Sequence, residues 1–152
     1  MNSATLKQRL QDDMKSAMKA GDKPRLGVIR LMLASIKQIE VDTRDELTDD
    51  QIIATLDKMT KQRRESAAQY EAAGRDELAQ QEQFEIGIIK DYLPAALTED
   101  EISALIDEAI SGTGAESVKD MGKVMGVLRP KLQGRADMAA VSAGIKRKLG
   151  AA

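Results

Sequence analysis

The chain of 152 residues contains no histidine, no cysteine and no tryptophan, and it has only one phenylalanine and two tyrosines. Without histidine or cysteine it lacks the usual side chains of Ser-His-Asp and Cys-His catalysis, of zinc sites and of thiol–disulfide exchange. An aromatic content of 2% also argues against a sheet that stacks nucleic-acid bases. We therefore expect no stand-alone enzyme, with no catalytic residue, no metal site and no cofactor.

The sequence also lacks long apolar runs. No stretch approaches the roughly 18 apolar residues that suggest a membrane-spanning helix. The N-terminal sequence MNSATLKQRLQDDMK contains acidic residues and no apolar core of a signal peptide. These features predict a cytoplasmic protein with no membrane partner.

Charge is nearly balanced over the whole chain, with a net charge of −2, but it is distributed unevenly. Residues 98–116 contain six acidic residues and no basic one, whereas residues 117–150 contain eight basic and two acidic residues. A basic segment with a net charge of +6 suits a polyanionic partner. The alternative is that the two segments pair with each other or form two solvated faces.

The composition is typical of helices, since Ala, Leu, Glu, Lys, Gln, Arg and Met dominate and no apolar residues alternate with a period of two. Apolar stripes and helix-end signals predict four helices before Pro94 and three shorter helices after it. We predict an all-α fold with two helical subdomains, a four-helix N-terminal one over residues 1–94 and a three-helix C-terminal one over residues 98–152.

Helix ends are predicted from capping residues. Thr48, Thr98 and Ser117 are expected N-caps, and Thr98 forms a capping box with a glutamate three residues later. Asp76 and Asp137 are expected to cap the fourth and the seventh helix.

Several interior positions are also predicted. Leu78, Phe84 and Val118 lie on apolar stripes and are expected in the core, and Pro130 is expected to limit the sixth helix. Arg63 interrupts an apolar face, so it either reaches a buried carboxylate or extends its charged end to the surface.

The sixth helix carries the most specific pattern. Lys119, Gly122, Gly126 and Arg129 follow one another at spacings of three, four and three residues, so they share one helix face. Two glycines inside a short helix cost roughly 1 kcal/mol each relative to alanine. Either another helix packs closely on the bare backbone, or a sugar-phosphate backbone approaches it between the flanking bases.

Three segments carry a resemblance to a known family. Residues 58–83 (KMTKQRRESAAQYEAAGRDELAQQEQ), 91–94 (DYLP) and 117–137 (SVKDMGKVMGVLRPKLQGRAD) resemble the GatB/YqeY family, and the match covers nearly the whole chain. The chain looks most like the free-standing YqeY-like proteins. It is also similar to the tail domain of the B subunit of the glutamine-dependent aspartyl/glutamyl-tRNA amidotransferase.

The resemblance implies an all-α fold with a four-helix and a three-helix subdomain, and binding of the tRNA body through the matched C-terminal motif. It does not carry over the activity of the amidotransferase, a carbon–nitrogen ligase with glutamine as amido-N-donor. This chain shows neither the Ser-Ser-Lys amidase site nor the cradle domain of that enzyme.

We therefore predict an accessory module that binds tRNA or another structured RNA. The candidate nucleic-acid-binding residues are Lys119, Gly122, Lys123, Gly126, Arg129, Lys131, Arg135, Lys146, Arg147 and Lys148. One alternative is a component that works with amidotransferase or aminoacyl-tRNA synthetase subunits. Another is a helical protein-interaction adaptor with no RNA role, in which the two glycines pack beneath a neighbouring helix.

Overall fold

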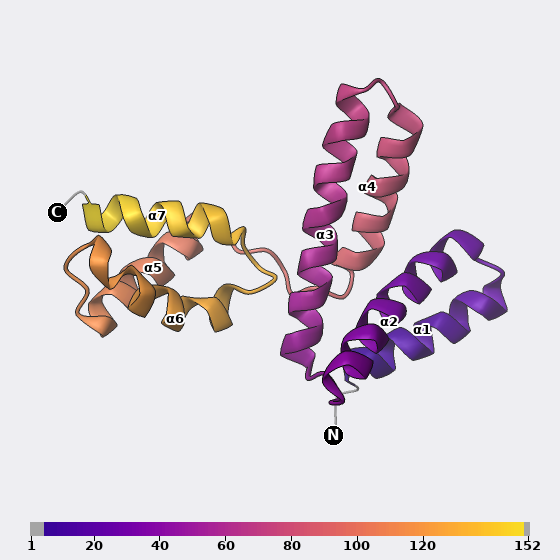
Figure 1. Ribbon diagram of the computed structural model, residues 1–152, viewed down its shortest axis with the longest axis horizontal. Coiled ribbons are helices and arrows are strands. Elements are labelled where there is room, and N and C mark those ends of the chain that lie inside the picture. Colours follow the sequence, from indigo (N-terminus) through magenta and orange to yellow (C-terminus); the bar gives the residue numbers. More distant parts are fainter. Residues whose placement is uncertain (1–4, 151–152) are drawn as a thin grey trace. The chain divides into compact units, whose positions relative to one another are not determined.

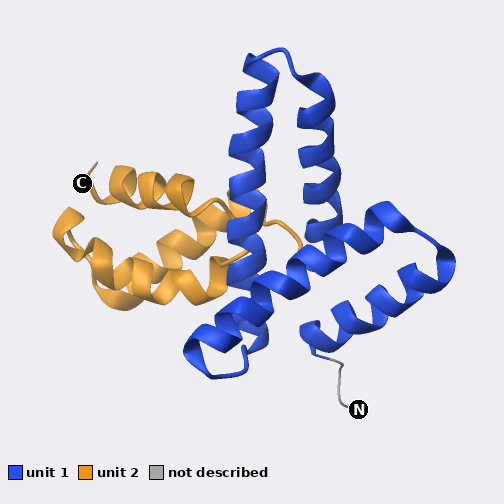
Figure 2. Ribbon diagram, turned by 45° about the vertical axis from the view of Figure 1, so that its right-hand side comes forward, with its two compact units in different colours: residues 1–93 blue, residues 94–152 orange. Residues whose placement is uncertain are grey.

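The computed structural model describes residues 5–150, which form seven α-helices and one short 3-10 helix with no strand among them (Figure 1). The prediction of an all-α fold is confirmed. The chain divides into two compact units, Met1–Leu93 and Pro94–Ala152 (Figure 2). That the two units act as separate functional domains stays a prediction.

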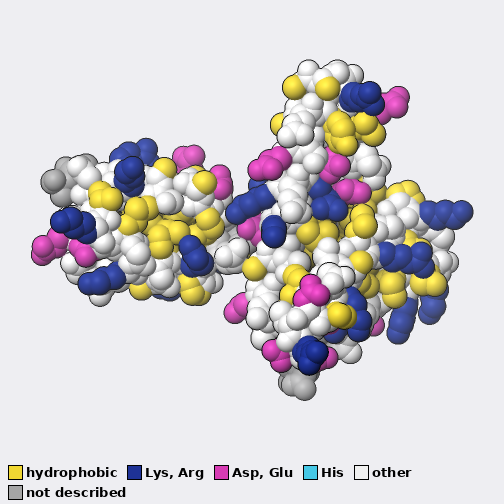
Figure 3. Space-filling view, in the orientation of Figure 1, with side chains coloured by type: hydrophobic (Ala, Val, Ile, Leu, Met, Phe, Trp, Pro, Cys, Tyr) yellow, Lys and Arg dark blue, Asp and Glu magenta, His cyan; other side chains and the backbone are white. Residues whose placement is uncertain are grey.

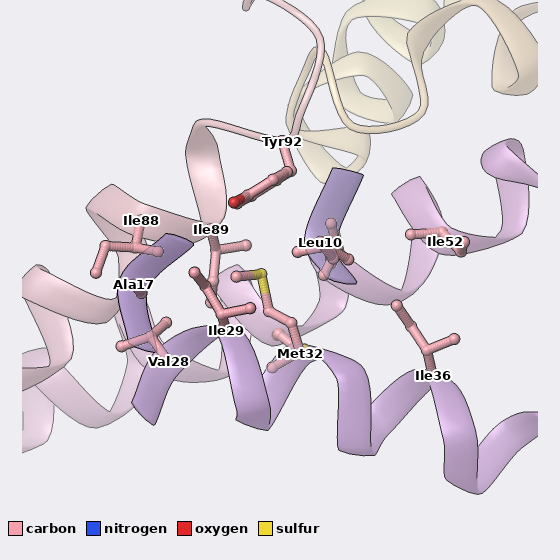
Figure 4. Packing of buried hydrophobic residues seen from close by; sticks show 12 residues of the cluster. Leu10, Ala17, Val28, Ile29, Met32, Ile36, Ile52, Ile88, Ile89 and Tyr92 are labelled. Carbon is pink, nitrogen blue, oxygen red and sulfur yellow. The ribbon is translucent and has the colours of Figure 1, made fainter. Parts of the chain in front are cut away.

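Unit 1 consists of four helices, α1 (Leu6–Ala20), α2 (Lys23–Thr43), α3 (Asp49–Ala72) and α4 (Asp76–Lys90). Their apolar stripes meet in one core, to which α2 contributes most because four of its side chains are buried. Figure 4 shows these side chains converging between the helices, with the ring of Tyr92 at one side of the cluster.

Unit 2 consists of α5 (Glu99–Thr113), the 3-10 helix η1 (Val118–Asp120), α6 (Met121–Leu132) and α7 (Met138–Gly150). Its core is separate from that of unit 1. It consists of one buried stripe from each α-helix, namely Ile106, Ala109, Val124, Leu128, Leu132, Val141, Ile145 and Leu149.

Most predicted caps are confirmed. Thr48 and Thr98 each accept a hydrogen bond from the backbone N–H three residues on and form reciprocal capping boxes. Asp137 accepts a hydrogen bond from the Ala139 N–H at 3.1 Å at the start of α7. The prediction for Asp76 is wrong, because α4 already begins at this residue and Arg75 precedes it. The turn is closed by the backbone, since the Arg75 N–H donates to the Tyr70 carbonyl at 2.8 Å.

Three interior predictions are wrong because the expected neighbours are missing. Leu78 and Phe84 are each 41% exposed. Figure 1 shows their helix, α4, paired with α3 in a hairpin whose far end stands clear of α1 and α2. Ala79 and Ile86 fill the face of α4 that meets α3. Val118 is 39% exposed because it lies in η1 rather than in the core-facing part of α6.

Pro130 does not end the sixth helix, which continues to Leu132. A proline inside a helix removes the hydrogen bond to the carbonyl four residues earlier, here that of Gly126. Gly126 is exposed, so water can satisfy its carbonyl, while complete burial of Leu132 holds the last turn on the core.

Arg63 takes the first of its two predicted positions. Its Nε donates to Glu85 Oε2 at 2.9 Å, and both side chains are largely buried. The interruption of the apolar face is therefore an ion pair between α3 and α4.

Candidate nucleic-acid interface

Packing of α6 orients the candidate interface. Val124, Leu128 and Leu132 are fully buried, so the opposite face of α6 points to solvent. Gly122 and Gly126 lie on this exposed face. No atom lies within 4 Å of the position that a Cβ would take at either glycine, apart from the helix's own backbone and chain neighbours. Neither glycine is therefore required for the packing of another helix.

Three basic residues flank the two glycines along the chain. The prediction that Lys119 belongs to the sixth helix is wrong, because a 3-10 turn, η1, precedes α6 and contains it, whereas Lys123 and Arg129 lie on α6. Lys119, Lys123 and Arg129 are exposed. The structure shows no side-chain ion pair or hydrogen bond from any of them within residues 5–150. We call Lys119, Gly122, Lys123, Gly126 and Arg129 the glycine strip. Its open helix backbone lies among bases that form no ion pair within the described residues, although the charge of Lys123 acts on the neighbouring Asp120.

One carboxylate lies beside the glycine strip. Asp120 Oδ2 accepts hydrogen bonds from the backbone N–H groups of Glu116 at 3.0 Å and Ser117 at 3.4 Å. These bonds, and then the positive charge of Lys123, lower the pKa of the Asp120 carboxyl. Asp120 therefore stays ionised at neutral pH, and its role is to close the turn that leads into α6.

The other candidate residues are not among the five residues of this strip. Lys131 is exposed on α6, but it follows Gly126 by five residues, which is about 140° round the helix axis. Lys146 and Arg147 are exposed on α7. Arg147 Nη2 comes within 3.9 Å of the Cβ position of Gly144, which itself packs against Ile106 of α5. Arg147 thus extends along the side of α7 that faces α5.

Two candidate residues hold unit 2 together. Lys148 Nζ lies 2.7 Å from Asp107 Oδ1 and 2.8 Å from Ser103 Oγ, which ties α7 to α5. Arg135 Nε donates to the Ala95 carbonyl at 3.2 Å. The Lys148–Asp107 ion pair therefore joins the acidic segment 98–116 to the basic segment 117–150. The bases of the glycine strip form no ion pair with the acidic segment. On the face of unit 2 that Figure 3 shows, the Lys and Arg side chains, in blue, are dispersed rather than gathered in one patch.

The described residues contain no group of three or more acidic side chains placed to hold a metal ion. They also contain no helix that combines the length and the apolar character needed to cross a membrane.

The sequence analysis did not identify three exposed bases on α2 as candidate binding residues. These are Lys23, Arg30 and Lys37, and their regular spacing of seven residues could have indicated that they share one helix face.

Comparison with known proteins identifies the family. The family model described as Yqey-like protein matches residues 7–149. A protein of Pyrenophora tritici-repentis named "Altered inheritance of mitochondria protein 41, mitochondrial" is 32% identical over 94% of this chain and 80% of its own length. Proteins of the same name from Eremothecium gossypii and Meyerozyma guilliermondii are 40% and 41% identical, over 57% and 55% of this chain and 48% and 44% of their own lengths.

The names of these relatives contradict the expectation of a cytoplasmic protein, because all three are named as mitochondrial. That expectation was wrong because it rested on the absence of a membrane-spanning run and of a secretory signal peptide, and neither absence distinguishes the cytoplasm from a mitochondrial location. The family match agrees with the resemblance of the sequence to YqeY-like proteins. With a family match over residues 7–149, the chain belongs to the YqeY-like family.

Proposed function

We propose that this chain binds structured RNA, with tRNA as the first candidate, through the sugar-phosphate backbone on the glycine strip. The observation that carries the proposal is the exposure of Gly122 and Gly126 with no neighbouring group near either Cβ position. Packing inside the molecule does not account for these glycines. A ligand that approaches the helix backbone closely would account for the absence of a side chain at both positions.

The flanking charges indicate the chemistry of that ligand. Lys119 and Arg129 have no acidic partner within the described residues, and Lys123 acts only on the neighbouring Asp120, whose pKa its charge helps to lower. The three bases flank a stretch of chain in which two positions carry no side chain. Phosphate contacts from such bases supply affinity and orientation but do not read sequence. The strip has no aromatic side chain on which a base could stack, so recognition would depend on the shape of the RNA.

The alternative of a protein-interaction adaptor with no RNA role predicted that the two glycines would be buried beneath a neighbouring helix. Both are exposed, so the burial that would favour this alternative is not found.

The resemblance to the amidotransferase tail supports a further proposal, that amidotransferase or aminoacyl-tRNA synthetase subunits are partners. Affinity capture with the intact chain, followed by mass spectrometry, should recover such a subunit. Recovery of none would contradict this proposal about partners.

Titration of labelled tRNA by fluorescence anisotropy tests RNA binding. Binding should weaken steeply between about 0.05 M and about 0.2 M salt, because phosphate contacts release counterions. The double variant Lys123→Glu, Arg129→Glu should weaken binding of all tRNAs alike. Because the relatives are named as mitochondrial proteins, mitochondrial tRNA should be included among the ligands.

The matched control is Lys58→Glu, Lys90→Glu, which makes the same change in net charge at two exposed lysines of unit 1. This control should bind tRNA as the unmodified chain does. No binding of tRNA by the unmodified chain at low salt would refute the proposal. Equal weakening by both double variants would show that net charge, rather than the glycine strip, governs binding.

A further inference from the structure

The solvent face of α2 carries a second regular line of basic residues. Lys23, Arg30 and Lys37 are all exposed, and seven residues separate each from the next. Seven residues are nearly two helical turns, so the three side chains share one face and follow one another about 10 Å apart along the axis. Figure 3 shows Lys and Arg side chains gathered over the α1–α2 hairpin, at the right of the view.

The charge of this line is only partly offset within the described part of the chain, through an attraction between Lys37 and Glu40 that is smaller than the effect of Lys7 on the same carboxyl. No acidic residue occurs between Lys23 and Ile39. None of the three bases has a side-chain ion pair or hydrogen bond within the described residues.

The two acidic residues near the end of α2 have other partners. Glu40 receives hydrogen bonds from Lys7 Nζ at 2.8 Å and from the Leu47 N–H at 3.0 Å. Asp42 accepts a hydrogen bond from the Gln38 amide at 3.0 Å. The remaining base of the helix, Arg25, forms its ion pair with Asp91 at 3.7 Å and is only partly exposed. Apart from the attraction between Lys37 and Glu40, the three exposed bases are separate from these pairs.

Small residues alternate with these bases. Gly27 lies between Lys23 and Arg30, and Ala34 lies between Arg30 and Lys37. Gly27 is exposed, and no atom lies within 4 Å of its Cβ position. A glycine in the interior of a helix is unfavourable relative to alanine, and no intramolecular contact accounts for this one. The pattern of exposed bases around open backbone is the same as in the glycine strip.

We propose that Lys23, Gly27, Arg30, Ala34 and Lys37, the α2 stripe, form a second contact surface for the phosphate backbone of the RNA. This inference rests on the proposed function. The stripe extends about 21 Å along the helix, since each residue adds about 1.5 Å. It gives the four-helix unit a direct part in RNA binding, which would otherwise belong to unit 2 alone.

The surface is better suited to RNA than to a lipid bilayer. A helix that lies in a membrane interface buries a broad apolar face. The apolar face of α2 is already buried in the core of unit 1, where Ile29 and Met32 have no exposed surface. Only Leu31 and Val41 are exposed large apolar residues of this helix.

Salt-dependent titration of tRNA with the full chain tests the α2 stripe. The triple variant Lys23→Gln, Arg30→Gln, Lys37→Gln should decrease the slope of log K against log salt by roughly two to three, or about one per lost phosphate contact. The matched control Lys58→Gln, Arg75→Gln, Lys90→Gln removes three exposed charges elsewhere in unit 1. Its slope should equal that of the unmodified chain.

The outcomes separate this inference from the proposed function. If the triple variant binds as the unmodified chain does while Lys123→Glu, Arg129→Glu weakens binding, the α2 stripe is refuted and the glycine strip stands. If the unmodified chain binds no tRNA, the proposed function itself fails. An equal loss in the control variant would refute the α2 stripe as a specific surface.

A second variant tests the close approach of the ligand. Gly27→Gln adds a side chain into open space, so it should leave the melting temperature unchanged or higher while it weakens tRNA binding several-fold. Unchanged affinity would refute close approach at Gly27. Sedimentation with vesicles of phosphatidylcholine and phosphatidylserine tests the lipid alternative. If the triple variant loses vesicle binding but retains tRNA binding, the assignment to RNA is overturned.

Discussion

Replacement of Gly126 by alanine should change stability and RNA binding in opposite directions. Gly126 lies inside α6 with helical backbone angles, and open space surrounds its Cβ position. A methyl group therefore meets no obstacle in the folded protein. It also restricts the unfolded chain, so the free energy of unfolding should rise by about 0.5–1 kcal/mol. This corresponds to an increase in melting temperature of roughly 1–8 °C, depending on how much of the chain unfolds together.

The binding of tRNA should fall in the same variant, because the new methyl group occupies the surface between Lys123 and Arg129. Urea unfolding followed by circular dichroism measures stability, and fluorescence anisotropy measures binding. Gly112→Ala serves as the control for helix propensity. Gly112 is exposed on α5, has nothing near its Cβ position and lies outside the glycine strip. This control should leave tRNA affinity unchanged.

Two results would refute the reasoning. A loss of stability in Gly126→Ala would show that the glycine has a structural purpose, for example in accommodating Pro130 four residues later. Gain of stability with undiminished tRNA affinity would show that no ligand approaches the helix backbone at this position. Only the opposite signs of the two effects support a surface kept open for binding.

Two further predictions concern unit 1. The Tyr92 hydroxyl donates a hydrogen bond to Asp13 at 2.5 Å, so Tyr92→Phe should lower the free energy of unfolding by about 1–3 kcal/mol in urea unfolding. Burial and then Asp13 raise the pKa of Tyr92 from 10.0 to about 12, so its contribution to stability is complete below pH 10 and is lost as the pH rises toward 12. The variant retains Tyr70, so the difference in tyrosinate absorbance between the unmodified chain and the variant reports Tyr92. A difference that titrates at the ordinary value of a tyrosine would contradict burial of Tyr92. Arg63→Ala leaves the Glu85 carboxylate unpaired between two helices and should cost about 1–3 kcal/mol. A double-mutant cycle with Glu85→Gln checks the coupling, and a coupling energy near zero would rule the ion pair out as the cause.

The helices and most of their ends could be predicted because these features depend on neighbours in sequence. The capping boxes at Thr48 and Thr98 each involve residues only three positions apart. The cap of α4 was placed wrongly because a backbone hydrogen bond from Arg75 closes the preceding turn, and no side-chain pattern reveals it.

In the candidate site, too, features that depend on neighbours in sequence could be predicted, and contacts between distant residues could not. Spacing along α6 predicted that Gly122, Gly126 and Arg129 share a face, since helical periodicity alone decides this. It did not predict that Lys148 is paired with Asp107, because the two residues are 41 positions apart. It also did not separate Lys131 from the glycine strip, since the acids and bases were counted along the segment rather than by helix face.

By itself, the sequence determined the all-α fold, the seven α-helices within residues 5–150 and the faces on which their residues lie, because helix formation and capping are local. Only the tertiary structure decided which of those faces are covered. Phe84 is exposed because, among the described helices of unit 1, none packs on its side of α4. The glycines of α6 are open because that helix packs through its other face. Burial depends on residues that are distant in sequence, and for this reason the surface proposed to bind RNA became visible only in the fold.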